Sequence, residues 1–174
     1  QDRIGADPGD RGALTQAAAG RWTELAPAKL NLALHVRGKR PDGRHNVEIL
    51  FAFCTDGDRL TGEFLPGTDT GIALEIDGPF ASDLHGPNLI ERAWDGLRAR
   101  VKEASDGHTR LTLIKNLPVA SGIGGGSADA AAALRLLTSM WRIDPAHAGA
   151  VAPMLGSGVP GCLLSLAGLG TGAR

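Results

Sequence analysis

The sequence predicts an α+β domain built as a two-layer sandwich, with a sheet on one side and helices on the other. Segments with the two-residue period of strands and segments with the longer period of helices both occur along the chain. They do not alternate in the steady strand–helix–strand order of a doubly wound sheet. The 174 residues, 43% of them hydrophobic, are enough for one packed core.

The first element is a strand over residues 28–38, where side chains of two kinds alternate. A period of two places four large apolar side chains on one face, namely Leu30, Leu32, Leu34 and Val36. The opposite face then carries Lys29, Asn31, Ala33 and His35. Lys29 and Asn31 are therefore expected side by side at one end of this second face.

Further strands follow a turn. Residues 40–45 read Arg-Pro-Asp-Gly-Arg-His, a composition typical of a turn. Residues 47–53 and 71–77 are strand candidates separated by polar segments that contain glycine. Residues 109–119 alternate again and lead into a cluster of glycines.

Two helices are predicted on the other layer. Asn88 is expected to cap the first, with Glu91 three residues later as its capping-box partner. Its apolar stripe is formed by Ile90, Trp94, Leu97 and Val101. The second starts at Ser127, with Ala130, Leu134, Leu137 and Trp141 on one face. We expect residues 1–22 to be a mobile tail, residues 23–174 to form the domain, and residues 148–173 to be its buried, loop-rich end.

Composition excludes several classes of protein. The net charge of −1 argues against a nucleic-acid-binding surface, and aromatic residues that could stack on bases make up only 4%. No segment predicts a membrane span, because the uncharged residues 148–173 contain prolines and many glycines. The two cysteines have neither a disulfide pattern nor metal-site spacing, which favours a reduced, cytoplasmic setting, and no metal ligands are assigned.

The glycine cluster between strand and helix is the main candidate site. Gly122, Gly124, Gly125 and Gly126 let the main chain approach a ligand closely, and main-chain amides at a helix start favour an anion. A phosphate group is the expected ligand, and a simple tight turn is the alternative. The loop lacks the Gly-Lys-Ser/Thr ending of a Walker A motif, and its spacing differs from the dinucleotide-binding fingerprint.

Four stretches taken together, PAKLNLALHV, RPDGRH, GPNLI and LPVASGIGGGSADAA, resemble the GHMP small-molecule kinases. The similarity runs from about Ala26 to the end of the chain. It implies the ribosomal-protein-S5-domain-2-like fold and the use of ATP, with Mg²⁺. The match is closest to the members that phosphorylate the 2-hydroxyl of a cytidyl-linked methylerythritol, a small-molecule substrate of the non-mevalonate isoprenoid pathway.

The resemblance also implies roles for individual residues. The loop that binds the ATP phosphates corresponds to Pro118, Val119, Ala120, Ser121, Gly122, Ile123, Gly124, Gly125, Gly126, Ser127 and Ala128. Lys29 corresponds to the catalytic lysine beside the transferred phosphate, and Asn31 to an asparagine that holds the substrate. His45 corresponds to the histidine that reads the cytosine, and Asn88 lies on the nucleotide side. From the residues alone, Ser127 is equally well explained as the N-cap of its helix.

The sequence departs from the family pattern at three points. Gly158, in LGSGVPGCLL, occupies the place of the aspartate that takes the proton from the acceptor hydroxyl. Arg44 stands where the family has a tyrosine that stacks on cytosine, although a guanidinium can also stack on a base. The chain stops before the family's C-terminal domain, so we expect that domain to be absent and its contact surface to be covered by self-association or by a partner.

These departures leave three functional hypotheses. The first is the cytidyl-substrate kinase with impaired activity, because a missing general base typically costs roughly 10²–10⁴-fold in rate. The second is a pseudokinase that binds nucleotide without transferring phosphate. The third is another GHMP kinase that acts on a small sugar or alcohol, which Arg44 leaves open.

Overall fold

The computed structural model describes residues 20–39, 41, 43, 45–101, 106–164 and 168–173. Five strands form one sheet: β1 (Arg21–Lys39), β2 (His45–Pro66), β3 (Gly71–Asp77), β4 (Gly107–Ile114) and β5 (Gly168–Ala173). Their order is β1-β2-β4-β3, and β5 pairs with β2 beside the β1–β2 hairpin. All neighbours are antiparallel except β3 and β4, which are parallel.

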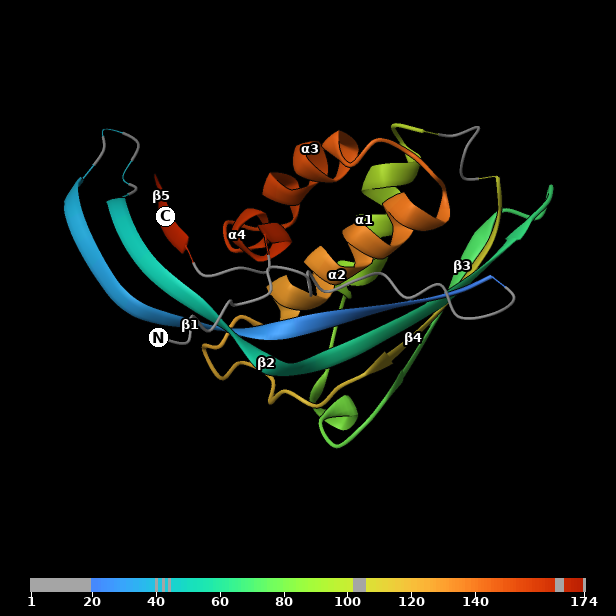
Figure 1. The fold of residues 1–174 in the computed structure, drawn as a ribbon, viewed down its shortest axis with the longest axis horizontal. Helices are drawn as coiled ribbons and strands as arrows, with labels where there is room; N and C mark the ends of the chain where they lie inside the picture. The colour runs from blue at the N-terminus through green and yellow to red at the C-terminus, as the bar shows by residue number, and fades with distance from the viewer. Residues whose placement is uncertain are drawn as a thin grey trace, which may run out of the picture.

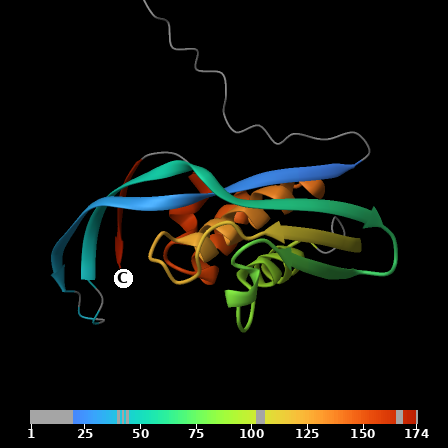
Figure 2. The ribbon, with the colours of Figure 1, turned by 90° about the horizontal axis from the view of Figure 1, so that it is seen from below.

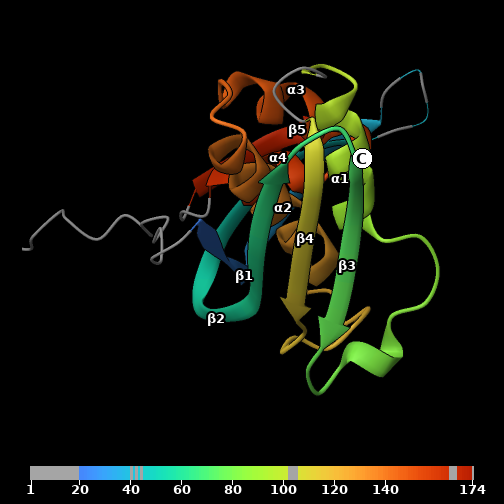
Figure 3. The same ribbon diagram turned by 90° about the vertical axis from the view of Figure 1, so that its right-hand side faces the viewer.

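The helices form a second layer on one face of this sheet (Figures 1 and 3). They are α1 (Leu89–Arg98), α2 (Gly125–Met140), α3 (Ala146–Leu155) and α4 (Val159–Leu164), with a short 3₁₀ turn η1 (Ala81–Asp83) before α1. The predicted two-layer α+β sandwich is thus confirmed. The β1–β2 hairpin extends past the helices at its turn end (Figures 1 and 2).

The core lies between the sheet and α2. Along β4, Leu111 and Leu113 face inward and are almost completely buried. Helix α2 is apolar on nearly every side, because it packs on β1 and β2 and also contacts α1, α3 and α4. The predicted stripe of α1 is confirmed where Ile90, Trp94 and Leu97 are buried. This central position of α2 fixes the start of the helix over the sheet.

The alternation predicted for residues 28–38 is wrong beyond Asn31. Asn31 lies opposite Phe51, whereas Ala33 lies opposite Leu50, so β1 carries one extra residue between these pairs. An inserted residue moves the following side chains to the other face of the strand. Leu34 therefore shares the face of Asn31. All residues from 30 to 39 are exposed among the described residues, including Leu30, Leu32, Leu34 and Val36.

Element boundaries also differ from the sequence analysis at both ends of the domain. Residues 1–19 of the predicted tail lie outside the described residues, whereas Arg21 and Trp22 already belong to β1. The described part of residues 148–173 is not loop-rich, because it contains α4, most of α3 and β5. Pro153 is accommodated inside α3. Among the described helices, none is both long and apolar enough to cross a membrane.

Candidate active site

The glycine loop connects the end of β4 to the start of α2, as predicted. Helix α2 begins at Gly125, and its N-cap is Gly124, which adopts the left-handed conformation with φ of 73°. Gly122 has a φ of 79° and Ala120 a φ of 56°. Side chains with a Cβ are disfavoured at such angles, so the glycines allow the sharp turns of this loop. Ser127 lies inside the helix, and its interpretation as the N-cap is wrong.

The main-chain amides of this loop find no partners among the residues that the structure describes. Within the described residues, no amide from Val119 to Ser127 donates a hydrogen bond to a protein atom. The loop is held in other ways: the Ser121 hydroxyl donates to the Pro118 carbonyl at 2.8 Å, and the Ile123 carbonyl accepts from the Lys29 amide at 2.9 Å. Unbonded amides beside a helix N-terminus are suited to bind an anion.

Lys29 brings a buried positive charge to this loop from β1. The residue is only 7% exposed, and its Nζ donates to Asn31 Oδ1 at 2.6 Å. The ammonium also lies 5.4 Å from the centre of the Phe51 ring. A Cβ built on Gly124 would stand 3.6 Å from the Lys29 Cβ, so the lysine stem packs directly against the loop. The predicted pairing of Lys29 with Asn31 is confirmed.

Asn88 lies at the edge of a pocket near the start of α2. Its Oδ1 accepts from the Ile90 amide at 2.8 Å, which confirms the predicted cap of α1. The pocket has a volume of about 250 Å³ and borders Gly126 and Asp129. Its remaining lining mixes apolar side chains of β3, of the segment before α1 and of α1 itself with two titratable ones: Leu74, Ile76, Leu84, Pro87 and Leu89, together with His85 and Glu91. A small group of a ligand could therefore occupy a space next to the glycine loop.

Sequence reasoning missed a buried charged cluster beneath the loop. Lys115, 1% exposed, donates to Asp129 Oδ2 at 2.9 Å and also forms an ion pair with Asp58. Burial alone would lower the pKa of Lys115, but the two carboxylates outweigh it and raise the pKa. The alternation of β4 could have revealed Lys115, because it follows Leu113 on the inward-facing side of the segment.

Asp129 titrates abnormally in this cluster. Burial, with a contribution from the Asp58 charge, raises the pKa of Asp129 to about 7, and the Lys115 charge opposes this rise. Its Oδ1 is buried and has no hydrogen-bond partner among the described residues. This carboxyl is therefore protonated more readily than an ordinary aspartate.

Gly158 also lies beside the loop helix. A Cβ built on Gly158 would stand 2.8 Å from Ser127 Oγ and 3.3 Å from Ser127 Cβ. Position 158 therefore faces the first turn of α2, yet it contributes no side chain there. A carboxylate at this position would reach the same end of the helix that the loop amides surround.

His45, which was predicted to read the cytosine, does not lie beside Lys29. His45 is exposed, starts β2 and lies opposite Lys39 at the turn end of the hairpin. Lys29 instead lies opposite Phe53, further along the hairpin. Arg44 lies outside the described residues. The structure thus brings together Lys29, Asn31 and the glycine loop.

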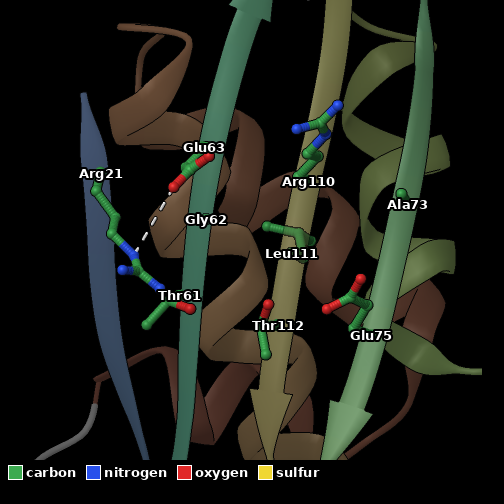
Figure 4. A pocket seen from close by; sticks show the side chains of 9 residues that line it. All are labelled: Arg21, Thr61, Gly62, Glu63, Ala73, Glu75, Arg110, Leu111 and Thr112. Carbon is green, nitrogen blue, oxygen red and sulfur yellow. Dashed lines mark ion pairs between the residues drawn. The ribbon is translucent and has the colours of Figure 1, made fainter. Parts of the chain in front are cut away.

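A second hollow lies on the other face of the sheet, away from the helices (Figure 4). It is lined by exposed side chains of neighbouring strands, among them Arg21 and Glu63, whose charged groups are 3.9 Å apart. No residue of the glycine loop borders it. Among the described residues, no group of three or more His, Cys, Asp or Glu side chains is arranged to hold a metal ion.

Comparison with known proteins identifies this arrangement. Residues 88–164 match the family model described as GHMP kinases N terminal domain. The chain is 48% identical over 142 residues to 4-diphosphocytidyl-2-C-methyl-D-erythritol kinase of Chelativorans sp. strain BNC1, covering 80% of this chain and 47% of that protein. The kinase of the same name from Rhizorhabdus wittichii is 46% identical over 165 residues, covering 87% of this chain and 54% of the relative.

A solved structure agrees with these relatives. The crystal structure of 4-(cytidine 5'-diphospho)-2C-methyl-D-erythritol kinase matches with a TM-score of 0.66 and 36% identity, over 86% of this chain and 52% of that one. The chain belongs to the GHMP kinase family. The fold resemblance inferred from the sequence is confirmed, and so is the similarity to this branch of the GHMP kinases. This GHMP kinase chain spans about half the length of the curated relatives it matches.

Proposed function

We propose that this GHMP kinase domain binds ATP at the glycine loop and supports transfer of the γ-phosphoryl group to a hydroxyl beside Lys29. The proposed acceptor is the 2-hydroxyl of 4-diphosphocytidyl-2-C-methyl-D-erythritol. This compound appears in the names of relatives that are 46–50% identical to the chain. The observation that carries the proposal is that every main-chain amide from Val119 to Ser127, around the start of α2, lacks a hydrogen-bond acceptor among the described residues.

The loop and the helix start supply the groups that a polyphosphate requires. Main-chain N–H groups can donate to phosphate oxygens, and the helix dipole adds roughly 0.3–1 kcal/mol for each nearby negative charge. Asn88 and Gly126 border the adjoining pocket, which is proposed to take the nucleoside. The Asn88 carbonyl oxygen is already used by the Ile90 amide, so its amide group remains to donate to a ligand.

Lys29 is proposed to stabilise the charge on the transferred phosphoryl group. A buried ammonium interacts more strongly with a phosphate than an exposed one, because less water screens it. Asn31 fixes the ammonium at 2.6 Å and, as an exposed residue, has its own amide group available for the acceptor molecule. His45, at the start of β2, is proposed to contact the cytosine by hydrogen bonding, and Arg44 is proposed to contact it by stacking.

Mg²⁺ is proposed to arrive with ATP rather than to occupy a site of its own. The described residues contain no cluster of acidic, histidine or cysteine side chains that could hold a metal. Magnesium in kinases is held largely by phosphate oxygens and water together with one or two protein groups. When bound, the ion would neutralise part of the phosphate charge that Lys29 and the loop amides also face.

The transfer is proposed to be slow, because Gly158 provides no group to accept the proton of the attacking hydroxyl. General bases contribute roughly 10²–10⁴-fold, whereas phosphoryl transfer depends mainly on positioning and charge. This observation also supports the second candidate function, a domain that binds nucleotide without transferring phosphate. Both functions require the same loop.

One sample can distinguish the two functions. ATP affinity is measured by calorimetry and product formation by phosphorus NMR, with the cytidyl substrate present. Replacing Lys29→Met should reduce the turnover, where it is detected, by roughly 10²–10³-fold and should weaken binding of ATP more than binding of AMP. Lys39→Met is the control, since this exposed lysine lies on the same strand at the hairpin end. Equal ATP affinity in the Lys29 variant and the parent would refute the proposed site.

A further inference from the structure

Both ends of the glycine loop are attached to one buried cluster of three charges. On the strand side, Asp58 of β2 accepts the Asn116 amide at 2.6 Å and the Leu117 amide at 2.7 Å through Oδ1. These are the last two residues before Pro118 and the loop. Asp58 is completely buried, so the exit of the chain from β4 is fixed by a carboxylate that water does not reach.

On the helix side, the attachment is made through Lys115. Its ammonium donates to Asp58 Oδ2 and, at 2.9 Å, to Asp129 Oδ2 in the first turns of α2. A Cβ built on Gly125 would stand 3.1 Å from Lys115 Nζ. The ammonium therefore lies directly beneath the helix start, and a single side chain links the strand before the loop to the helix after it.

We propose that Asp58, Lys115 and Asp129 together hold the glycine loop in the conformation that accepts polyphosphate, with Lys115 as the positioning residue. This inference rests on the proposed function, since it assigns the cluster to the same loop. Lys115 is buried beneath the loop and acts through the main chain. Its role is distinct from that of Lys29, which approaches the loop from β1 and pairs with Asn31.

The charge of the cluster has a consequence for binding. With both carboxylates ionised, the three side chains sum to one negative charge, which opposes a polyphosphate at the nearby helix start. Protonation of Asp129 removes that charge. Burial raises the pKa of Asp129 to about 7, so binding of a polyphosphate near neutral pH should be accompanied by proton uptake. His85 and Glu91 are the other titratable groups lining the adjoining pocket.

The positioning role can be tested without any nucleotide. The variants are Lys115→Met and the isosteric Asp129→Asn, and the control is Glu24→Gln. Glu24 pairs with Arg135 at 2.8 Å in a second part-buried ion pair between β1 and α2 that does not touch the loop. Amide hydrogen exchange is followed by NMR at Asn116, Leu117 and Ala128, and it is normalised to the amides that pair β1 with β2.

Exchange at these three amides should be about tenfold faster in Lys115→Met, relative to the strand amides, and unchanged in Glu24→Gln. Asp129→Asn should give a smaller increase in the same direction, because a neutral amide oxygen still accepts from Lys115. If Lys115→Met does not fold, the exchange rates of Asp129→Asn provide the test of the positioning role. The positioning role would be overturned if, in both Lys115→Met and Asp129→Asn, exchange at these three amides rose no more than exchange at the strand amides.

Nucleotide binding gives the second readout. If the competent loop conformation falls to a tenth of its population, the affinity of Lys115→Met for a non-hydrolysable ATP analogue falls about tenfold. Glu24→Gln should bind within about twofold of the parent. Calorimetry in two buffers of different ionisation enthalpy should show proton uptake near pH 7 in the parent and none in Asp129→Asn. Unchanged affinity in Lys115→Met, or equal uptake in Asp129→Asn, would contradict the inference.

These experiments distinguish a failure of the proposed function from a failure of the positioning role. A parent chain that binds no ATP analogue would refute the proposed function, while faster exchange at the loop anchors would still establish that the cluster holds the loop. If the parent binds the analogue normally and the amides of Asn116, Leu117 and Ala128 exchange no faster in Lys115→Met, the inference is refuted but the proposed function is not.

Discussion

Gly158 packs against Ser127 so closely that any side chain at position 158 must displace the serine hydroxyl. A Cβ on Gly158 would stand 2.8 Å from Ser127 Oγ, well inside the normal contact distance, and 3.3 Å from Ser127 Cβ. The hydroxyl can rotate away, but the Cβ is fixed by the helix. Position 158, which the sequence resemblance matches to a proton-accepting aspartate, therefore has no side chain, and Ser127 restricts the space for one.

Restoring the carboxylate should consequently have a modest effect. We expect Gly158→Asp to raise the rate of phosphoryl transfer by less than the roughly 10²–10⁴-fold that a general base normally contributes, because the new side chain must first move Ser127. The rate is measured under single-turnover conditions with ATP and the cytidyl substrate. Gly158→Ala is the matched control, since it introduces the same Cβ without the carboxylate.

The double variant Gly158→Asp with Ser127→Ala separates the two contributions. Removing the hydroxyl relieves the 2.8 Å contact, so the double variant should be faster than Gly158→Asp alone. A Gly158→Asp variant that alone recovers the full range expected of a general base would show that the contact with Ser127 is harmless. Identical rates for the aspartate and alanine variants would show that position 158 does not take part in the proton transfer.

Asn88 is predicted to have two separable roles. Its Oδ1 caps α1 through the Ile90 amide, and its Nδ2 is available at the edge of the pocket. Asn88→Ala should lower the free energy of unfolding by about 0.5–2 kcal/mol through loss of the cap. Asn88→Asp keeps the capping oxygen, so its stability in urea should be near that of the parent, yet its affinity for ATP should fall because the donor is lost.

A nucleotide affinity that follows stability in both Asn88 variants would contradict the second role. It would leave Asn88 as a structural cap only, and the pocket would then be recognised through its apolar lining.

The sequence was sufficient for the parts of this domain that depend on local pattern. The strand, glycine loop and helix around residues 109–141 follow from periodicity and from the conformations that glycine permits, and the structure has them in that order. The cap of α1 by Asn88 likewise depends on neighbours in sequence. The pairing of Lys29 with Asn31 followed from a separation of two residues on one strand.

Long-range features were not accessible in this way. The extra residue in β1 near Leu32 is defined only by its pairing with β2, and a strict alternation in the sequence conceals it. The ion pairs of Lys115 join residues 57 and 14 positions away in sequence. A lysine in phase with buried leucines indicates that partners must exist, but only the packing of β2 and α2 identifies them as Asp58 and Asp129.

Two neighbouring glycines at the start of α2 should respond differently to alanine. Both lie in the helix, where Gly→Ala normally stabilises by about 0.5–1 kcal/mol. A Cβ on Gly126 would make an ordinary contact of 3.8 Å with Leu89, whereas a Cβ on Gly125 would stand 3.1 Å from Lys115 Nζ. Gly126→Ala should therefore be the more stable variant in thermal unfolding.

The gain in stability should not extend to ligand binding. Gly126 lines it, so its new methyl group should weaken ATP binding, even though the fold is stabilised. Higher stability together with unchanged affinity in Gly126→Ala would place the nucleoside elsewhere. Equal stabilisation by both alanines would mean that the Lys115 ammonium moves away without cost.

The stability of the fold should fall as the pH rises through neutrality. Burial raises the pKa of Asp129 from an ordinary 3.8 to about 7, so between these values the folded chain holds a proton that the unfolded chain has released. A folded state that binds more protons loses stability with rising pH, and the loss is complete above the folded pKa. The free energy of unfolding in urea should therefore decrease from about pH 4, where the unfolded carboxyl releases its proton, until the pH has passed the folded pKa of about 7, and then level off.

Asp129→Asn should remove most of this slope, because the amide does not titrate. A smaller slope in the same direction should persist, since burial also raises the pKa of Glu24. Asp83→Asn is the control, because this aspartate of η1 is exposed to solvent. If the Asp129 and Asp83 variants both keep the full slope of the parent, the proton is bound by another group. The coupling between Asp129 and the nucleotide loop would then lose its basis.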